Sequence, residues 1–420
     1  MADTDTFTQR LARLCALILG ATGLIPAVAI LAAIGFQPGY ITRVEKRQPA
    51  ALPALTPQTL VRQETFETLS AVVNDRFPFK GSLVELMTLL DIKLLGKTRF
   101  ATVDVGRDGW LYLRASYGPP NLGYDSAAQE ALAVLEAFLE QDSAIAASAT
   151  QSRAKLRLVI APDKHVIYPQ YLTPQGQAEV ARGQAARSLI RQWFQTRAAA
   201  DPRLIDLWSV LEEQKFSELV YMANDTHHSP HGAWLMARAI VESIDPQAWY
   251  PQPLAEKSYI RDPGDLELLL GLNRYSVGEQ RRYRAYQQPE MPEASVVVEQ
   301  QTFASLAEAN DDLCIARQLP PNCISHREKR FFNGGAATIA AKTLIVHDSF
   351  MEAFTLDLLV PLFREVTFVH FDEITPDDLR AAIDRYDYVV LESVERNAFW
   401  PNNSKDSRIV RFFGEMTADE

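Results

Sequence analysis

Ser349, His227 and Asp225 have the side chains of a nucleophile, a general base and a carboxylate that orients the base. Asp225 and His227 are two residues apart. Residues with this spacing in an extended segment point to the same side, so the carboxylate can fix the tautomer of the imidazole. His227 could then take the hydroxyl proton of Ser349 during the attack and return it to the leaving group. The three residues together predict acyl transfer through an acyl-serine.

Ser349 comes directly before an expected helix, which gives it a second reason to be catalytic. The first N–H groups of that helix, including the N–H of Ser349, would face a developing oxyanion. A plainer explanation remains open, because a serine before a helix commonly caps it. Asp225 could likewise cap a turn beside a surface histidine.

The histidines near Asp225 also suggest a metal site. His227 and His231 are four residues apart, and His228 and Asp225 could add ligands for a divalent ion. Pro230, at the expected first position of a helix, falls between the two histidines, so the spacing does not place them on one helix face. We therefore expect no metal and no bound cofactor.

The two candidate segments each follow a predicted strand, and open parallel sheets bind ligands at the carboxyl ends of their strands. Short apolar runs alternate with helical periodicity through most of the chain. We expect helices at 127–147, 178–199, 230–244, 351–363 and 377–386, and strands at 156–161, 219–221, 343–346, 366–371 and 388–391. Strands that are apolar throughout predict an α/β fold with a mainly parallel sheet and helices on both faces.

Other polar residues occupy similar places in this pattern. Lys164 and Tyr168 come after one predicted strand, and Glu392, Arg396 and Asn397 come after the last one. Lys164, Tyr168, Arg396 and Asn397 are therefore predicted to bind substrate. Local ion pairs and helix caps would explain these residues equally well.

The N-terminal part of the chain predicts a membrane anchor. Residues 14–36 form a run of 23 without a charge, long enough to cross a hydrocarbon core of ~30 Å as a helix. A short tail at 1–13 precedes this transmembrane segment, and a cleaved signal peptide is the rival interpretation. Basic residues flank the run on both sides, so the positive-inside rule does not orient it. We expect a Pro-containing extended tether at 37–60, then one folded domain at 61–420 with an insertion at about 250–332, where the α/β alternation stops.

Composition and cysteine usage narrow the function further. The 420 residues are 47% hydrophobic and 23% charged, as in a globular protein, and the formal net charge of −11 argues against a nucleic-acid partner. Cys314 and Cys323 could form a disulfide in an oxidising compartment, or remain two free thiols.

Four segments of the chain resemble one family. They are GRDGWLYL at 106–113, IAPDK at 160–164 followed by Tyr168, Asp225-Thr226-His227, and Asp348-Ser349-Phe350. In this order they are similar to the motifs of the SGNH-hydrolase-like O-acetyltransferases of the alginate-modifying AlgJ/AlgX group. In plain SGNH esterases the Asp and His follow the serine, whereas here they precede it, as in the acetyltransferase branch.

The resemblance implies an SGNH-hydrolase-like (flavodoxin-like) fold and an activity. It implies that acetyl groups pass through acyl-Ser349 to hydroxyls of an exopolysaccharide, with the acetyl relayed from acetyl-CoA by a multi-pass membrane O-acyltransferase. It also implies a single-pass protein of the inner membrane with its catalytic domain in the periplasm. An acetylesterase on the same triad and a non-catalytic polymer-binding subunit remain alternatives. His347, where the family often has Gly, and His228, where it commonly has Trp, leave the shape of the pocket open.

Overall fold

The computed structural model describes residues 38–418, except 46, 54–61, 78, 119–121, 149–154, 251–252, 288–293, 318–322, 326, 335–336, 353 and 402–405. The predicted anchor at 14–36 lies outside these residues. None of the helices within the described part is both long and apolar enough for a membrane span. The chain divides into two compact units. One takes in the described residues up to Ala101 together with Asp265–Val277, and the other consists of Thr102–Gly264 and Gly278 onward.

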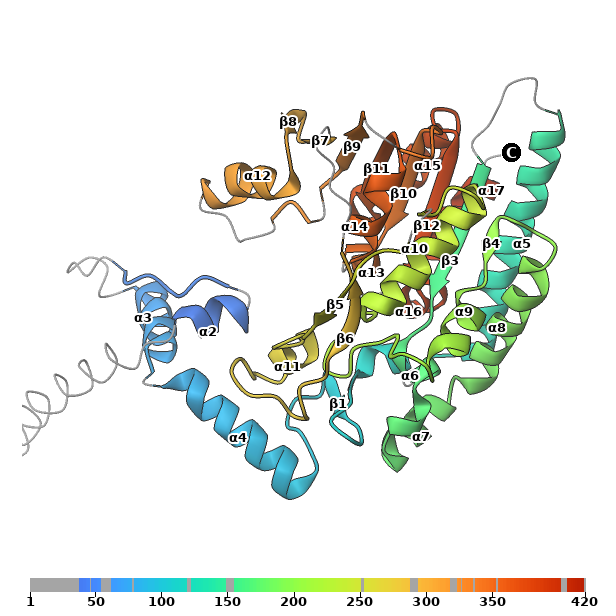
Figure 1. The fold of residues 1–420 in the computed structure, drawn as a ribbon. Helices are drawn as coiled ribbons and strands as arrows, with labels where there is room; N and C mark the ends of the chain where they lie inside the picture. The colour runs from blue at the N-terminus through green and yellow to red at the C-terminus, as the bar shows by residue number, and fades with distance from the viewer. Residues whose placement is uncertain are drawn as a thin grey trace, which may run out of the picture. The chain divides into compact units, whose positions relative to one another are not determined.

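The larger unit is built on an eight-stranded sheet (Figure 1). Five neighbouring strands run parallel, in the order β4 (Leu204–Ile205), β3 (Lys155–Ala161), β12 (Tyr388–Val394), β10 (Thr343–His347) and β11 (Glu365–His370). Three antiparallel strands extend it beyond β11, namely β9 (Lys329–Asn333), β7 (Ala294–Val298) and β8 (Gln301–Phe303).

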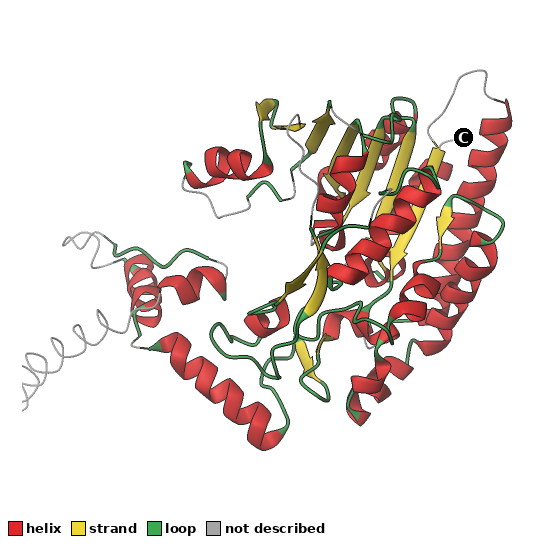
Figure 2. Cartoon of the chain, in the orientation of Figure 1, coloured by secondary structure: helices red, strands yellow, loops and turns green. Residues whose placement is uncertain are grey.

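Helices cover both faces of this sheet (Figure 2). Alternate residues of β3 enter two different cores, with Leu158 and Ile160 in one and Val159 and Ala161 in the other, as a two-residue repeat requires. The first core is closed by α5 (Tyr124–Ser148), α8 (Gln184–Ala198), α15 (Pro376–Ile383), α16 (Glu395–Phe399) and α17 (Arg408–Ala418). The second is closed by α9 (Leu207–Gln214), α10 (Pro230–Ile244) and α14 (Thr355–Leu359). The predicted α/β fold with helices on both faces is confirmed.

Several short elements complete the described chain. The smaller unit contains α2 (Pro38–Arg43), α3 (Gln63–Asp75), α4 (Lys80–Leu95) and α11 (Asp265–Leu269). The larger unit also has the hairpin β1 (Val103–Val105) and β2 (Leu111–Leu113), the hairpin β5 (Glu256–Tyr259) and β6 (Tyr283–Tyr286), and the helices α6 (Lys164–Ile167), α7 (Pro174–Ala181), α12 (Leu306–Asn310) and α13 (Ser349–Glu352).

The structure differs from the sequence prediction at five places. The helix expected at 178–199 is divided into α7 and α8 by a turn at 182–183. Residues 219–221 do not form a strand of the sheet, because only Tyr221 pairs, in an isolated bridge with His228. The helix expected at 351–363 is broken at Phe354, whose φ of 106° takes the backbone out of the helical region.

The other two differences concern domain organisation. The second half of the expected insertion is not separate, since β7, β8 and β9 pair onto the main sheet. The expected tether contains α2, whose Tyr40 and Ile41 are buried, so its described part is not extended throughout.

Candidate active site

The Asp225 segment is a tight loop closed at its base by backbone pairing. Met222 N–H donates to the His227 carbonyl at 3.3 Å, and Ser229 N–H donates to the Val220 carbonyl at 3.0 Å. Ser229 then caps α10, because its Oγ accepts from Gly232 N–H at 3.1 Å, and Pro230 follows at the first helical position. This helix start is the one predicted from the sequence.

Gly232 lets α10 begin directly against this loop. A Cβ atom at that position would lie 2.1 Å from the Val220 carbonyl oxygen, which is closer than any side chain can come. The glycine therefore fixes how near the helix approaches the segment that presents Asp225 and His227.

The structure brings Ser349, His227 and Asp225 into one hydrogen-bonded chain. His227 Nε2 lies 3.0 Å from Ser349 Oγ, and His227 Nδ1 lies 2.7 Å from Asp225 Oδ1. Asp225 Oδ1 also accepts from the backbone N–H of His227 at 3.0 Å. The Asp225 side chain is fully buried, while that of His227 is 17% exposed, so the imidazole lies between a buried carboxylate and the partly exposed Ser349. This is the geometry of an activated serine nucleophile.

Arg261 extends this chain by one residue, and sequence reasoning missed it. Its Nε donates to Asp225 Oδ2 at 2.8 Å, so the two carboxylate oxygens hold His227 on one side and a guanidinium on the other. Arg261 follows β5, in the expected insertion, and no local pattern indicates that it returns to a loop 36 residues earlier.

Lys164 lies beneath the same loop and contacts its backbone. Its buried Nζ donates to the carbonyls of Met222, Ala223 and Asp225 at 3.1, 3.1 and 2.7 Å. These three bonds take up the three N–H donors of an ammonium group. These contacts hold the Asp225 loop in shape, and the predicted role of Lys164 in substrate binding stays a prediction.

Ser349 is the first residue of α13, directly beyond the end of β10. The preceding residue, Asp348, takes up the next two N–H groups, since Phe350 N–H donates to its carboxylate at 3.0 Å and Met351 N–H to its carbonyl at 3.1 Å. The N–H of Ser349 has no acceptor within the part of the chain that the structure describes. Of the helix N–H groups predicted to face an oxyanion, that of Ser349 is the one left to do so.

Asp348 is held from behind by a buried polar cluster. Its Oδ2 accepts from Val394 N–H at 2.9 Å and from Arg408 at 2.6 Å, and its N–H donates to Glu392 Oε2 at 3.1 Å. Burial raises the pKa of Asp348, but the Arg408 charge and the backbone donors outweigh it and leave the pKa below its usual value. Burial, and then the Asp348 carboxylate, raise the pKa of Glu392 well above its usual range.

The remaining predicted binding residues have different surroundings. Tyr168 is buried in the core, where its hydroxyl accepts from Val220 N–H at 3.0 Å. Arg396 pairs with the buried Asp163 and its guanidinium lies 5.6 Å from the centre of the Phe350 ring, beside the nucleophile. Asn397 follows on α16 and is half-buried. Arg396 is thus the one of this set that the structure places against the Ser349 segment.

His228 and His231, the other histidines considered as metal ligands, contact aromatic side chains instead. His228 is buried with its ring 4.6 Å from that of Tyr221 and 5.0 Å from that of Phe350, and burial lowers its pKa to about 3. His231 Nδ1 lies 2.5 Å from the Tyr286 hydroxyl. Neither imidazole joins His227, so the four-residue spacing does not build a metal site.

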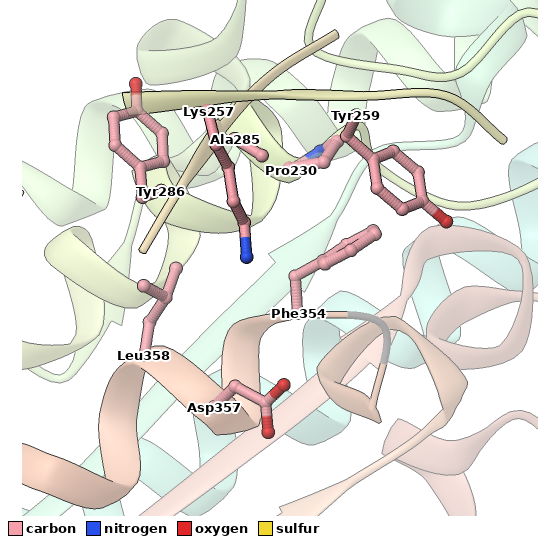
Figure 3. Close-up of a pocket in the computed structure, with 8 residues that line it drawn as sticks. All are labelled: Pro230, Lys257, Tyr259, Ala285, Tyr286, Phe354, Asp357 and Leu358. Atoms are coloured by element: carbon pink, nitrogen blue, oxygen red, sulfur yellow. The ribbon is translucent and has the colours of Figure 1, made fainter. Parts of the chain in front are cut away.

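A cavity of about 180 Å³ opens close to these segments. Its walls include Pro230, three residues after His227, and Phe354, five residues after Ser349. Figure 3 shows the aromatic side chains of Tyr259, Tyr286 and Phe354 around the space, with Lys257 extending into it. The other lining residues are Ala285, Asp357 and Leu358.

The fold and the site define an α/β protein with a serine, a histidine and an aspartate in one hydrogen-bonded chain. Residues 103–311 match the family described as "SGNH hydrolase-like domain, acetyltransferase AlgX". The matched range includes Asp225 and His227 and ends before Ser349.

The sequence is also similar to those of two curated proteins. The chain is 26% identical over 223 residues to "Probable alginate O-acetylase AlgJ" of Pseudomonas putida, covering 51% of this chain and 54% of that protein. It is 29% identical over 207 residues to the protein of the same name from Pseudomonas fluorescens, covering 48% and 49%. The chain spans about half the length of the curated relatives that it matches. These comparisons confirm the resemblance to the AlgJ/AlgX group.

Two solved structures are similar to the chain. PatB1 of Bacillus cereus with a sulfonyl adduct aligns with a TM-score of 0.46 and 15% identity, covering 73% of this chain and 100% of that one. The O-acetyltransferase domain of Pseudomonas putida AlgJ aligns with a TM-score of 0.41 and 19% identity, covering 76% and 99%.

Proposed function

We propose that the protein is an O-acetyltransferase that passes acetyl groups through acyl-Ser349 to hydroxyls of an exopolysaccharide in the cell envelope. The observation that carries this proposal is the hydrogen-bonded chain from Ser349 Oγ through His227 to Asp225, at 3.0 and 2.7 Å. The names of the curated relatives, both alginate O-acetylases, support the choice of a polysaccharide acceptor.

The first half-reaction acetylates the serine. His227 Nε2 takes the proton of Ser349 as Oγ bonds to the acetyl carbon of the donor, and the Asp225 carboxylate stabilises the imidazolium. The carbonyl oxygen becomes an oxyanion, and the N–H of Ser349 can donate a hydrogen bond to it. Collapse of this intermediate breaks the bond to the leaving group, which receives the proton from His227.

The second half-reaction moves the acetyl group to the sugar. A sugar hydroxyl attacks the acetyl carbon while His227 takes its proton. When the bond to Ser349 Oγ breaks, the oxygen recovers that proton and the sugar ester leaves. Water in place of the sugar would give the acetylesterase, so the two enzymes differ in whether water reaches the acyl-serine.

The cavity beside the site is the proposed place of the acceptor sugar. Tyr259, Tyr286 and Phe354 offer ring faces for stacking on a pyranose, and Lys257 offers a cation (Figure 3). If this is correct, Lys257→Ala lowers transfer to the sugar and leaves acetylation of Ser349 by a small ester intact. Lys155→Ala, at the exposed start of β3, is the control.

The cellular setting is part of the proposal. The uncharged run at 14–36 would anchor the chain in the inner membrane, and a multi-pass O-acyltransferase in that membrane would supply acetyl from acetyl-CoA. The disulfide between Cys314 and Cys323 supports a periplasmic location for the folded part, because such bonds persist in oxidising compartments.

Intact mass spectrometry tests the chemistry. The full chain is exposed to p-nitrophenyl acetate, with Ser349→Ala as control, and an oligosaccharide is then offered. An acetyl adduct that maps to Ser349 and passes to the sugar supports the transferase. An adduct that only water removes favours the esterase, and equal behaviour of wild type and control favours the non-catalytic polymer-binding subunit. Loss of the adduct with EDTA would restore the metal alternative.

A further inference from the structure

Helix α4 buries two polar side chains beside Gly81 and Ile92, and most of its large apolar side chains are exposed. Its buried positions include Glu85 and Thr88. Glu85 accepts from the backbone N–H of Asn273 at 2.8 Å and pairs with Arg274 at 2.7 Å, and Thr88 Oγ1 donates to the Leu270 carbonyl at 3.2 Å. The helix is therefore held to residues 270–274 of its own unit by polar contacts.

The opposite face of α4 is a continuous apolar stripe. Its members recur at intervals of three and four residues, which places them on one side of the helix. The exposed fractions are 45% for Leu83, 53% for Leu86, 45% for Met87, 42% for Leu90 and 75% for Leu94. Surface helices of globular proteins have the reverse arrangement, so this stripe marks a face that something covers.

The smaller unit as a whole shares this property. Twelve of the sixteen large hydrophobic side chains that are exposed among the described residues belong to it, although it is the smaller of the two units. Val73, Phe77 and Phe79 directly precede α4 and belong to this group. If exposed apolar side chains were spread evenly over the protein, the larger unit would have more of them. Their concentration in the smaller unit therefore indicates a surface adapted to an apolar environment.

The position of this unit in the chain indicates a lipid surface as the occupant. Helix α2 begins at Pro38, two residues after the uncharged run ends at Phe36. Tyr40 of α2 is buried against the segment that holds α4, since a Cβ at Gly271 would lie 3.0 Å from the Tyr40 hydroxyl and 2.8 Å from Val84 of α4. The short helix that begins two residues after the run therefore lies, with α4, against Gly271.

The length and charges of α4 fit a helix that lies on a bilayer. Sixteen residues extend about 24 Å at 1.5 Å per residue, less than a hydrocarbon core. Lys93 in its last turn and Lys97 beyond it are exposed and could meet lipid phosphates. An apolar face with cations at its edge is the pattern of an interfacial helix.

We propose that α4 lies in the headgroup region of the membrane that holds the uncharged run, with Leu86, Leu90 and Leu94 directed to the acyl chains. This inference depends on the membrane anchor of the proposed function. The helix would hold the start of the folded chain against the bilayer surface.

Depth-dependent fluorescence quenching tests the proposal in the full chain. In a Cys15→Ser background, Leu90→Cys is labelled with the NBD fluorophore and the protein is reconstituted in phosphatidylethanolamine and phosphatidylglycerol vesicles with doxyl-labelled lipid. The matched control is Leu189→Cys on α8, because the two leucines are 42% and 39% exposed and both are helical. We expect a blue-shifted emission and severalfold stronger quenching at position 90 than at position 189. Circular dichroism confirms that both labelled chains are folded.

The other results separate the two proposals. If the chain does not float with the vesicles after a high-salt wash, the anchor is wrong and the interfacial helix is wrong with it. If the chain floats and position 90 is not quenched, or both positions are quenched equally, the interfacial helix alone is overturned. A second copy of the chain or another protein would then cover the stripe.

Discussion

Arg408, the first residue of the C-terminal helix, donates a hydrogen bond of 2.6 Å to Oδ2 of Asp348, the residue before the candidate nucleophile. The same nitrogen lies 2.8 Å from Ser393 Oγ, at the end of β12. Asp348 in turn accepts from the N–H of Phe350, so the guanidinium, the carboxylate and the turn that presents Ser349 are connected. The last helix of the chain therefore supports the nucleophile.

Replacing Arg408 by Leu should destabilise the fold. It leaves the buried Asp348 carboxylate without its charged partner, and breaking a buried pair in this way costs about 3–5 kcal/mol. Arg408→Lys should lose less, because an ammonium group keeps the charge without the planar fork. Urea unfolding measures both, with Arg411→Leu on the same helix as control. Equal losses in Arg408→Leu and Arg411→Leu would show that the Asp348 pair is not the cause.

Glu392→Gln should stabilise the protein at neutral pH. Because the folded pKa of Glu392 is raised, the stability that this group contributes is fully present below its unfolded pKa and is lost as pH rises toward the folded pKa. Glutamine does not ionise and can still accept from the Asp348 N–H. The variant should have a higher free energy of unfolding than wild type at pH 7 and a similar one at pH 4. Glu415→Gln, at an exposed site on α17, should show no such pH-dependent gain.

Lys164→Gln distinguishes a role in substrate binding from a role in holding the Asp225 loop. Acetylation of Ser349 by p-nitrophenyl acetate involves no sugar. If Lys164 holds the loop through its three carbonyl contacts, the acetylation rate itself should fall, by about 10²-fold for a displacement of about 1 Å. If Lys164 binds substrate, acetylation should be normal and only transfer to the oligosaccharide should suffer. Lys155→Gln, at the exposed start of β3, is the control.

The triad segments were predictable because each carries its own local signal. Ser229 as N-cap and Pro230 as first helical residue mark the start of α10. Apolar runs mark β10 and β12. The end of β10 places Ser349 at the carboxyl edge of the sheet, and the start of α10 places His227 in the loop directly before that helix.

The supporting residues carried no such signal. Arg261 and Arg408 reach the site across 36 and 60 residues, and their partners depend on how the insertion and the last helix pack. Lys164 was noticed for its place after a strand, but its burial beneath the loop follows from the tertiary structure. A strand was predicted at 219–221 from apolar content alone, and the pairing with His228 instead makes it the base of a loop.

The buried histidines should make the protein sensitive to acid. Burial lowers the pKa of His228 and that of His347 to about 3, so both are neutral in the folded state at pH 5. The stability that each contributes is present above the ordinary histidine pKa and is lost as pH falls toward 3. His228→Phe, which keeps a ring between Tyr221 and Phe350, should remove about 2 kcal/mol of the stability change between pH 7 and pH 5. Urea unfolding at the two pH values checks this, and an unchanged difference would mean that His228 is charged in the folded protein.

The disulfide between Cys314 and Cys323 predicts how many cysteines react with a thiol reagent. The number depends on whether the compartment is oxidising. Of the three cysteines, only Cys15 should react with iodoacetamide when the chain is extracted from the envelope and denatured without reductant. A reduced and denatured sample should take three labels and serves as the control. Loss of the bond should cost about 3 kcal/mol by the entropy of the loop that it closes, and Cys314→Ser should unfold at correspondingly lower urea. Three labels without reductant would show that the pair is reduced in the cell, which would remove the support that the disulfide gives to a periplasmic location.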